Sequence, residues 1–142
     1  MYILKVTADF DSAHFLKGYR GKCSNIHGHR WKIVSEIFSE TLCTDGQQRG
    51  MVVDFATVKK DLKKLTDEFD HTLIIEKNSL KEKTLSALLE ENFKITQVDF
   101  RPTAECFAKF FFDEMKKFGY NVKKVTVYET ENNCAVYEEN TP

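Results

Sequence analysis

The sequence predicts an α+β fold in which an antiparallel sheet carries helices on one face. Three observations support this prediction: two long alternating runs near the N-terminus, two stretches with apolar residues at helical spacing, and a C-terminal segment typical of a β-hairpin. Strands that precede and follow helices in this way favour a layer of helices packed on one sheet. We expect four antiparallel strands and two long helices in a single domain over residues 1–142.

The first two strands are expected over residues 2–14 and 29–39. In each run, apolar side chains recur at every second position. Such side chains project from one side of a strand, so each run has one face suited to burial. A basic, glycine-containing loop over residues 17–22 lies between the runs, and a turn over residues 43–50 follows them.

Two helices are expected to begin after Asp54 and Thr103. Asp54 is a candidate N-cap, because apolar residues follow at spacings of three and four as far as Phe69. Thr103 is a second candidate cap, and phenylalanines at helical spacing follow it until Gly119. We interpret this aromatic stripe as core, because phenylalanines in such a pattern usually pack against other elements.

A C-terminal hairpin is expected over residues 122–139, with its turn at Asn132-Asn133. The chain between the two helices has a weaker pattern. Residues 80–91 are compatible with a short helix, and residues 95–100 with a short strand or an extended lead into the second helix. The predicted order is therefore strand, strand, helix, optional short helix, helix, strand, strand.

Composition excludes several functional classes. With 42% apolar residues, 30% charged residues and a net charge of −1, the chain is typical of a globular protein, whereas a nucleic-acid binder is usually basic. No signal-peptide pattern and no run of about 18 apolar residues is present, so we expect a cytoplasmic protein without a membrane segment. Four cysteines without a CxxC pair are expected to stay reduced. At 142 residues the chain is short for an enzyme that works alone, so we expect an oligomer.

Three of the four histidines lie within sixteen residues and form a candidate metal site. His27 and His29 are two apart, so on a strand both imidazoles project to one side. His14, at the end of the first predicted strand, is positioned to supply a third ligand. Three protein ligands leave a fourth zinc position open, which is typical of a catalytic site. The alternative is that these are ordinary histidines on a half-buried strand.

Cys23 lies beside this cluster and is a candidate acid/base if a partner makes it a thiolate. His71 is the only histidine left over for that role, and Asp70 is placed to orient it or to stabilise its charge. The neighbourhood of Asp70-His71 alone favours a solvated helix end.

Two glutamates complete the set of candidates. Glu129 is in phase with the apolar face of its predicted strand, and an inward carboxylate suits a heterocycle with adjacent NH groups, such as a pterin. The alternative is a solvated glutamate at a sheet edge. Glu105 is a weaker candidate, because an acidic side chain in a first helical turn already interacts favourably with the helix dipole.

Six motifs together resemble the 6-pyruvoyltetrahydropterin synthase and 6-carboxytetrahydropterin synthase family, in order and over nearly the whole chain. They are Phe10-Asp-Ser-Ala-His14, Cys23 separated by three residues from His27-Gly-His29, Gly50-Met-Val-Val-Asp54-Phe55, Phe69-Asp70-His71, Pro102-Thr-Ala-Glu105, and Val127-Tyr-Glu129-Thr with the following Ala-Val-Tyr. The gap of three residues after Cys23 resembles the carboxy branch, which serves queuosine and other 7-deazapurine pathways, whereas the pyruvoyl branch typically has a longer gap.

The resemblance implies a tunnelling fold of four antiparallel strands and two long helices, in which trimers close a barrel and two trimers stack into a homohexamer. It implies zinc on the three histidines, Cys23 as general acid/base with Asp70 and His71 as partners, and Glu129 holding the pterin ring. Thr103 and Glu105 match the Pro-Thr-x-Glu motif that is expected to shape the pterin pocket. The region 76–100 is longer than the family pattern, which affects the expected oligomer surface more than the chemistry.

The implied substrate is 7,8-dihydroneopterin triphosphate, and the implied products are 6-carboxy-5,6,7,8-tetrahydropterin, acetaldehyde and triphosphate. Lys17, Arg20 and Lys22 are candidates for binding the triphosphate, although lysines near turns are usually only solubilising. Two other functions stay open. One is 6-pyruvoyltetrahydropterin synthesis, which eliminates triphosphate without chain cleavage, and the other is a non-enzymatic module in which Cys23 closes a four-ligand zinc site.

Overall fold

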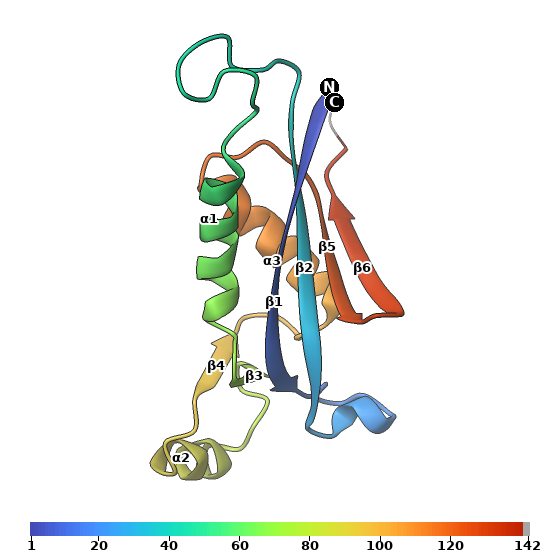
Figure 1. Cartoon of the computed structure of the whole chain (residues 1–142). Helices are drawn as coiled ribbons and strands as arrows, with labels where there is room; N and C mark the ends of the chain where they lie inside the picture. The colour runs from blue at the N-terminus through green and yellow to red at the C-terminus, as the bar shows by residue number, and fades with distance from the viewer. Residues whose placement is uncertain (141–142) are drawn as a thin grey trace.

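Two long strands form the centre of the molecule. The computed structural model describes residues 1–140, so the last two residues of the predicted domain lie outside it. β1 (Tyr2–His14) and β2 (His27–Ser39) pair antiparallel over their full length, from Tyr2 opposite Ser39 to His14 opposite His27 (Figure 1). The first predicted strand is confirmed, and the second begins two residues earlier than predicted because His27 and Gly28 join the ladder.

The sheet has six strands rather than four, in the order β4-β3-β1-β2-β5-β6. β5 (Val122–Thr130) and β6 (Asn133–Glu138) form the predicted hairpin. β3 (Thr72–Glu76) and β4 (Ile95–Val98) run parallel to the end of β1, so the prediction of a four-stranded, purely antiparallel sheet is wrong. β3 was missed because five residues directly after a helix give too short a run to show a strand period. The α+β class is confirmed.

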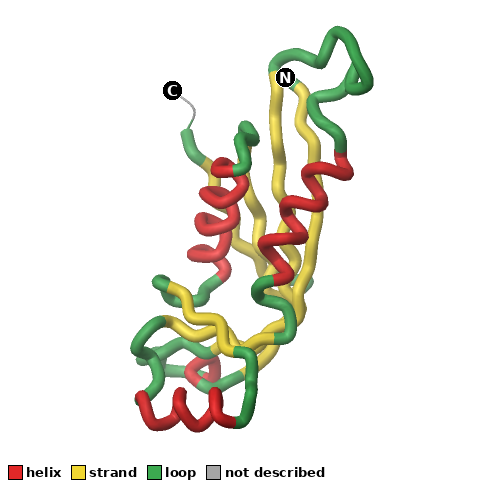
Figure 2. Tube along the Cα trace, turned by 90° about the vertical axis from the view of Figure 1, so that its left-hand side faces the viewer, coloured by secondary structure: helices red, strands yellow, loops and turns green. Residues whose placement is uncertain are grey.

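Two long helices cover one face of the sheet, as predicted. α1 (Phe55–Asp67) packs mainly on β1, and α3 (Ala104–Lys117) packs on β5 and β6. Figure 2 shows the two helices beside each other against the strands. Both predicted caps are present: Asp54 Oδ1 accepts a hydrogen bond from the backbone N–H of Ala56 at 2.8 Å, and Thr103 Oγ1 accepts one from that of Cys106 at 3.2 Å.

A third helix, α2 (Glu82–Glu90), matches the short helix that the weaker pattern allowed. It lies away from α1 and α3, near β3 and β4, and none of its residues is buried (Figure 1). None of the helices formed by residues 1–140 is long and apolar enough to cross a lipid bilayer.

The aromatic stripe of α3 lies in the core, as predicted. Phe107, Phe111 and Met115 are fully buried. The ring centroid of Phe107 lies 5.2 Å from that of Trp31 on β2 and 6.2 Å from that of Phe10 on β1. The stripe therefore ties α3 to the two central strands, close to their histidine-bearing ends.

Removal of the Phe107 ring tests this core. We expect Phe107→Ala to lower the free energy of unfolding by about 3 to 5 kcal/mol, because a fully buried ring leaves a cavity that the surrounding side chains fill only in part. The matched control is Phe93→Ala, since the Phe93 side chain is exposed; its effect should stay within about 0.5 kcal/mol. Urea unfolding followed by circular dichroism measures both. Equal losses in the two variants would contradict this description of the core.

Candidate metal centre and active site

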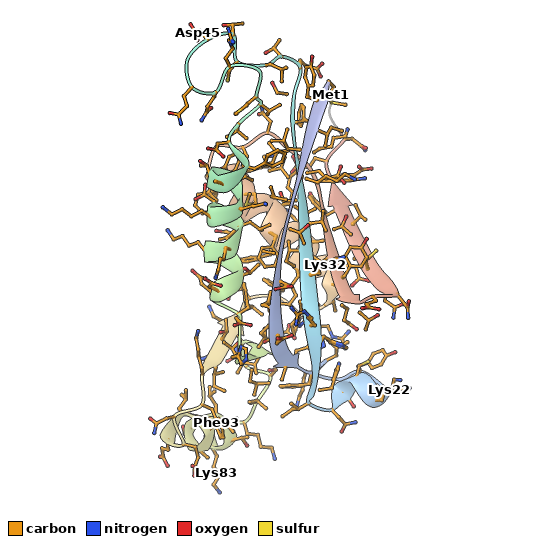
Figure 3. The ribbon with its side chains drawn as sticks, viewed as in Figure 1. Met1, Lys22, Lys32, Asp45, Lys83 and Phe93 are labelled. Carbon is orange, nitrogen blue, oxygen red and sulfur yellow. The ribbon has the colours of Figure 1, made fainter. Side chains whose placement is uncertain are left out.

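Three histidines converge at the end of the central ladder. His14 ends β1, His27 begins β2 directly opposite it, and His29 lies two residues further along on the same face. One potential ligand atom from each ring lies within 4.8 Å of the other two. Figure 3 shows the side chains around this end of the molecule, where Lys22 marks the loop between β1 and β2, and Lys32 marks β2 beyond the histidines. The structure thus brings together the ligand set that the sequence predicts.

Backbone carbonyls orient two of the rings. His14 Nδ1 lies 2.7 Å from the carbonyl oxygen of Pro102, and His27 Nδ1 lies 2.7 Å from that of Asn25. A carbonyl oxygen only accepts, so each Nδ1 carries the hydrogen and each neutral ring directs the lone pair of its Nε2 elsewhere. The two Nε2 atoms face each other 3.0 Å apart. Two facing lone pairs repel unless a cation lies between or beside them.

The third ring is half-buried, but its Nε2 atom is fully buried. His29 Nε2 is inaccessible to water and makes no hydrogen bond within the described residues, although Glu129 Oε1 lies 3.4 Å from it. Burial lowers the pKa of His29, against the effect of the Glu129 charge, which raises it. Burial also lowers the pKa of His14 to about 4, and the neighbouring histidines act in the same direction. Both rings are therefore neutral near pH 7, the state that binds metal.

These features fit a zinc ion. Nitrogen ligands at about 2.0 to 2.1 Å in a tetrahedral site lie about 3.3 Å apart, close to the spacing found between His14 and His27. The carbonyl partners on the opposite ring nitrogens are the usual outer contacts of metal-binding imidazoles. Among residues 1–140, Cys23 does not belong to the group, so the donor set is three imidazole nitrogens with one coordination position left for another ligand. The donor set does not favour a closed four-ligand structural site.

Trp31 lies directly behind the histidines. Its ring centroid is 4.9 Å from that of His14 and 5.5 Å from that of His29, and the residue is fully buried. It is the only tryptophan of the chain. Its fluorescence is therefore a specific reporter of the histidine cluster.

Cys23 lies in the loop between β1 and β2, within a single 3-10 turn, Lys22–Ser24. Its side chain is half-buried, and its backbone oxygen accepts a hydrogen bond from the N–H of Leu16 at 2.9 Å. Within the described residues, no hydrogen bond joins the Cys23 thiol to His71. The acid/base role of Cys23 stays a prediction. Lys17, Arg20 and Lys22 are exposed on the same loop, and their role in triphosphate binding also stays a prediction.

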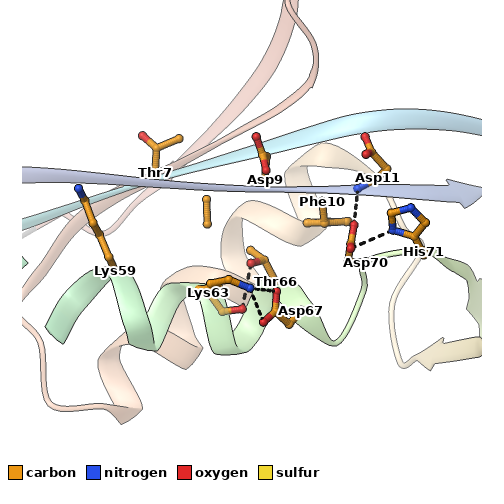
Figure 4. A pocket seen from close by; sticks show the side chains of 11 residues that line it. Thr7, Asp9, Phe10, Asp11, Lys59, Lys63, Thr66, Asp67, Asp70 and His71 are labelled. Atoms are coloured by element: carbon orange, nitrogen blue, oxygen red, sulfur yellow. Dashed lines mark hydrogen bonds and ion pairs between the residues drawn. The ribbon is translucent and has the colours of Figure 1, made fainter. Parts of the chain in front are cut away.

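Asp70 and His71 lie where α1 gives way to β3. Asp70 Oδ1 accepts a hydrogen bond from the backbone N–H of Asp11 at 2.9 Å, and its Oδ2 lies 2.9 Å from His71 Nδ1 (Figure 4). The Asp11 bond, and then the His71 bond, lower the pKa of Asp70, so this carboxylate is ionised. His71 has a left-handed backbone with φ of 55°, which is uncommon for a side chain other than glycine.

The pair is more than a solvated helix end, because its backbone and carboxylate are both tied to β1. The His71 N–H donates to the carbonyl oxygen of Asp11 at 2.7 Å, while its imidazole stays largely exposed. Asp70 and His71 line a cavity of about 450 Å³ between β1 and α1. The proposed orientation of His71 by Asp70 has the required contact, whereas the catalytic roles of both residues stay predictions.

The predicted pterin residues lie on two different elements. Glu129 is partly exposed near the end of β5 and lines a second cavity of about 410 Å³ together with His29 and Tyr128. Thr103 uses its hydroxyl to cap α3, and Glu105 is exposed in the first turn of that helix. Only Glu129 therefore has a cavity and a neighbouring histidine that suit ligand binding directly.

Several residues that organise the site were not predicted. The carbonyl groups of Pro102 and Asn25 orient two imidazoles, Trp31 lies behind them, and the backbone of Asp11 holds the Asp70-His71 pair. Every residue has a carbonyl group, and every residue except proline has an N–H, so no sequence signal distinguishes these contacts. Trp31 was assigned to the core face of its strand, but its contact with the histidines depends on strand pairing.

The fold and the three-histidine centre together define a candidate metalloenzyme. Comparison with known proteins identifies the family of the chain. Residues 3–140 match the model of the family described as 6-pyruvoyl tetrahydropterin synthase. The chain is 35% identical over 142 residues to the 6-carboxy-5,6,7,8-tetrahydropterin synthase of Haemophilus influenzae, covering 98% of this chain and 100% of that protein. It is 39% identical over 128 residues to the protein of the same name from Aquifex aeolicus, covering 83% and 76%.

Solved structures show the same fold at lower identity. An uncharacterized protein from Wolinella succinogenes matches with a TM-score of 0.75 and 23% identity, over 99% of this chain and 100% of that one. The 6-pyruvoyl tetrahydropterin synthase of Caenorhabditis elegans matches with a TM-score of 0.68 and 23% identity, over 98% and 96%. The chain belongs to the 6-pyruvoyl tetrahydropterin synthase family, which confirms the resemblance that its motifs indicate.

The ligand set can be tested with the histidines themselves. We expect the purified protein to carry about one zinc per chain and His27→Ala to lose most of it, because two remaining imidazoles bind zinc far more weakly than three. His71→Ala is the control, since it removes the one histidine outside the cluster and should keep its zinc. Elemental analysis and the fluorescence of Trp31 during metal removal report the result. Full zinc occupancy in His27→Ala would remove His27 from the ligand set.

Proposed function

We propose that the protein is a zinc-dependent 6-carboxy-5,6,7,8-tetrahydropterin synthase of the cytoplasm, a lyase that supplies queuosine or 7-deazapurine biosynthesis. It converts 7,8-dihydroneopterin triphosphate and one water to 6-carboxytetrahydropterin, acetaldehyde and triphosphate. The observation that carries the proposal is the convergence of three imidazoles beside Glu129, in a chain 35% and 39% identical to proteins of that name.

Glu129 is proposed to hold the pterin ring. An ionised carboxylate accepts two parallel hydrogen bonds, and the amino group and ring NH of a pterin are two adjacent donors. The cavity that Glu129 lines also contains His29, so a ring bound there has its side chain next to the histidine cluster. In this pose the reacting carbons, rather than the ring, would lie at the proposed metal site.

Cys23 is proposed to move the proton. Its thiolate would take a proton from a side-chain carbon of the substrate, and His71 would accept the thiol proton, with ionised Asp70 stabilising the resulting imidazolium. Zinc bound to the three histidines would supply a Lewis acid that lowers the pKa of substrate hydroxyl groups and stabilises negative charge on their oxygens. The contact of Asp70 with His71 Nδ1 supports this order, because it leaves Nε2 free to exchange a proton.

A homohexamer made of two trimers is the proposed assembly. Along β1, β3 pairs only with Ser12–His14, so within the described residues the outer edge of residues 2–11 has no strand partner. β6 forms the opposite edge of the sheet. Unpaired strand edges are suited to pairing with another chain, and repeated pairing of β1 with β6 would close a barrel. Native mass spectrometry of the purified protein tests this assembly.

The competing activity is 6-pyruvoyltetrahydropterin synthesis, which the description of the matching family model favours. The zinc ligands do not separate the two reactions, whereas the products do. Incubation of the purified protein with 7,8-dihydroneopterin triphosphate, followed by mass spectrometry, should yield 6-carboxytetrahydropterin and acetaldehyde. A 6-pyruvoyl product would establish the alternative, and the absence of any turnover by zinc-loaded protein would favour a binding module.

Replacement of the proposed acid/base tests the proton-transfer step. We expect Cys23→Ala to keep zinc and pterin binding but to lower turnover by a factor on the order of 100 or more, because the group that carries the proton is lost. Cys134→Ala is the control, since this cysteine is exposed on β6. Steady-state kinetics and zinc content are measured for both. Near-normal turnover in zinc-loaded Cys23→Ala would refute the assignment.

A second replacement tests the pterin anchor. We expect Glu129→Gln to lose roughly 2 to 4 kcal/mol of pterin binding, because one acceptor becomes a donor that faces a donor. Zinc content should not change, since the group is not among the proposed ligands. Glu138→Gln on β6, where the side chain is exposed, is the matched control. Calorimetric titration with pterin measures affinity; unaltered affinity would make Glu129 a solvated edge residue.

A further inference from the structure

Two adjacent residues before α3, Arg101 and Pro102, contact two parts of the proposed site: the loop that carries Cys23 and the histidine cluster. The carbonyl oxygen of Pro102 accepts the hydrogen bond from His14 Nδ1 at 2.7 Å. Arg101 Nη2 donates a hydrogen bond to the carbonyl oxygen of Lys17 at 3.1 Å, in the loop that carries Cys23. One dipeptide therefore connects the histidine centre to the thiol loop.

The loop itself is closed by short contacts. Besides the bond from Leu16 N–H to the Cys23 carbonyl, the Asn25 N–H donates to the Lys22 carbonyl at 3.1 Å. These bonds define the turn around Cys23, but they are all internal to the loop. The Asn25 carbonyl ties the end of the loop next to β2 to His27, but none of these bonds holds the side of the loop over residues 17–21.

Arg101 contacts that side of the loop from outside it. Its guanidinium carbon lies 5.9 Å from the centre of the Tyr19 ring, within the range of a cation–π contact. The Tyr19 ring in turn lies against Gly21, where a Cβ atom would come within 2.8 Å of Tyr19 Cε1. Arg101 therefore contacts the loop at both Lys17 and Tyr19, and through Tyr19 reaches the residue next to the Cys23 turn.

The opposite end of this connection is rigid. Pro102 is buried and has a fixed φ, and the N–H of Thr103 donates to the carbonyl oxygen of Arg101 at 2.7 Å. Thr103 also caps α3, whose aromatic stripe is anchored in the core. Arg101 thus projects from a segment whose backbone moves little.

We infer that Arg101 is a positioning residue that holds the Cys23 loop at a set distance from the His14 centre. This inference rests on the proposed role of Cys23 in proton transfer. Arg101 acts through the loop, with no contact to substrate required of it. Loss of its two contacts would let the loop open, which exposes the thiol and moves it out of line with the reacting carbon.

The test uses Arg101→Ala in the zinc-loaded full-length protein. We expect iodoacetamide to alkylate Cys23 about fivefold faster, which corresponds to the loss of one net hydrogen bond that holds the loop closed. We expect kcat to fall about tenfold with KM changed less than twofold and zinc content retained, since only the position of the thiol changes. Peptide mass spectrometry follows Cys23, with Cys43 and Cys134, both exposed, as internal references.

Matched variants separate positioning from other effects. Arg49→Ala, in the exposed loop at the other end of the molecule, should leave both readouts unchanged. Arg101→Lys should restore part of the protection, because a lysine donates to the Lys17 carbonyl but lacks the planar guanidinium. Tyr19→Ala should also raise the Cys23 alkylation rate. In the double variant, the rate increase should be smaller than the product of the two single increases, because both residues act through the same contact.

Two results would overturn the inference. One is an unchanged Cys23 alkylation rate in both Arg101→Ala and Tyr19→Ala. The other is a raised KM with normal kcat in Arg101→Ala, which would make Arg101 a direct ligand of the substrate triphosphate. The alkylation measurement requires no substrate, so failure of the proposed pterin chemistry would appear as absent product in the unmodified protein and would leave this measurement interpretable.

Discussion

The register of the ladder between β1 and β2 is the constraint on which the rest of the site depends. Phe10 opposes Trp31 on the same face where His14 opposes His27. A slip of one residue would turn every side chain of a strand to the other face, so burial of the two aromatic rings also fixes the histidines. Packing of the core therefore also sets the positions of the three proposed ligands on their strands.

Ring orientation has a different origin. Strand pairing places the imidazoles, but the carbonyl groups of Pro102 and Asn25 determine which nitrogen of each ring faces the centre. Both carbonyls belong to loops, one of them held by the start of α3. A buried, unpaired nitrogen such as His29 Nε2 costs roughly 1 to 3 kcal/mol, a cost that a bound cation would remove.

The sequence predicted what depends on local periodicity and missed what depends on tertiary pairing. The alternating runs, both helix caps and the ligand trio follow from spacing along one chain segment. The parallel pairing of β3 with β4 was not predicted, because parallel pairing joins segments distant in sequence and leaves no turn signal. The contact of Asp70 with His71 follows from adjacency, but the left-handed backbone of His71 does not, since a histidine rarely adopts it.

The division between ladder and loop also indicates where the choice of product is made. The histidine trio is held by the core ladder and is expected in both candidate activities, so it cannot distinguish them. The thiol lies four residues before His27, in a turn whose distance from the ladder depends on the length of that connection and on the Arg101 contacts. A longer connection would move the thiol along the substrate side chain while leaving the metal in place. If Cys23 moves the proton as proposed, the loop would determine which carbon loses its proton, while the ladder holds the histidines in place.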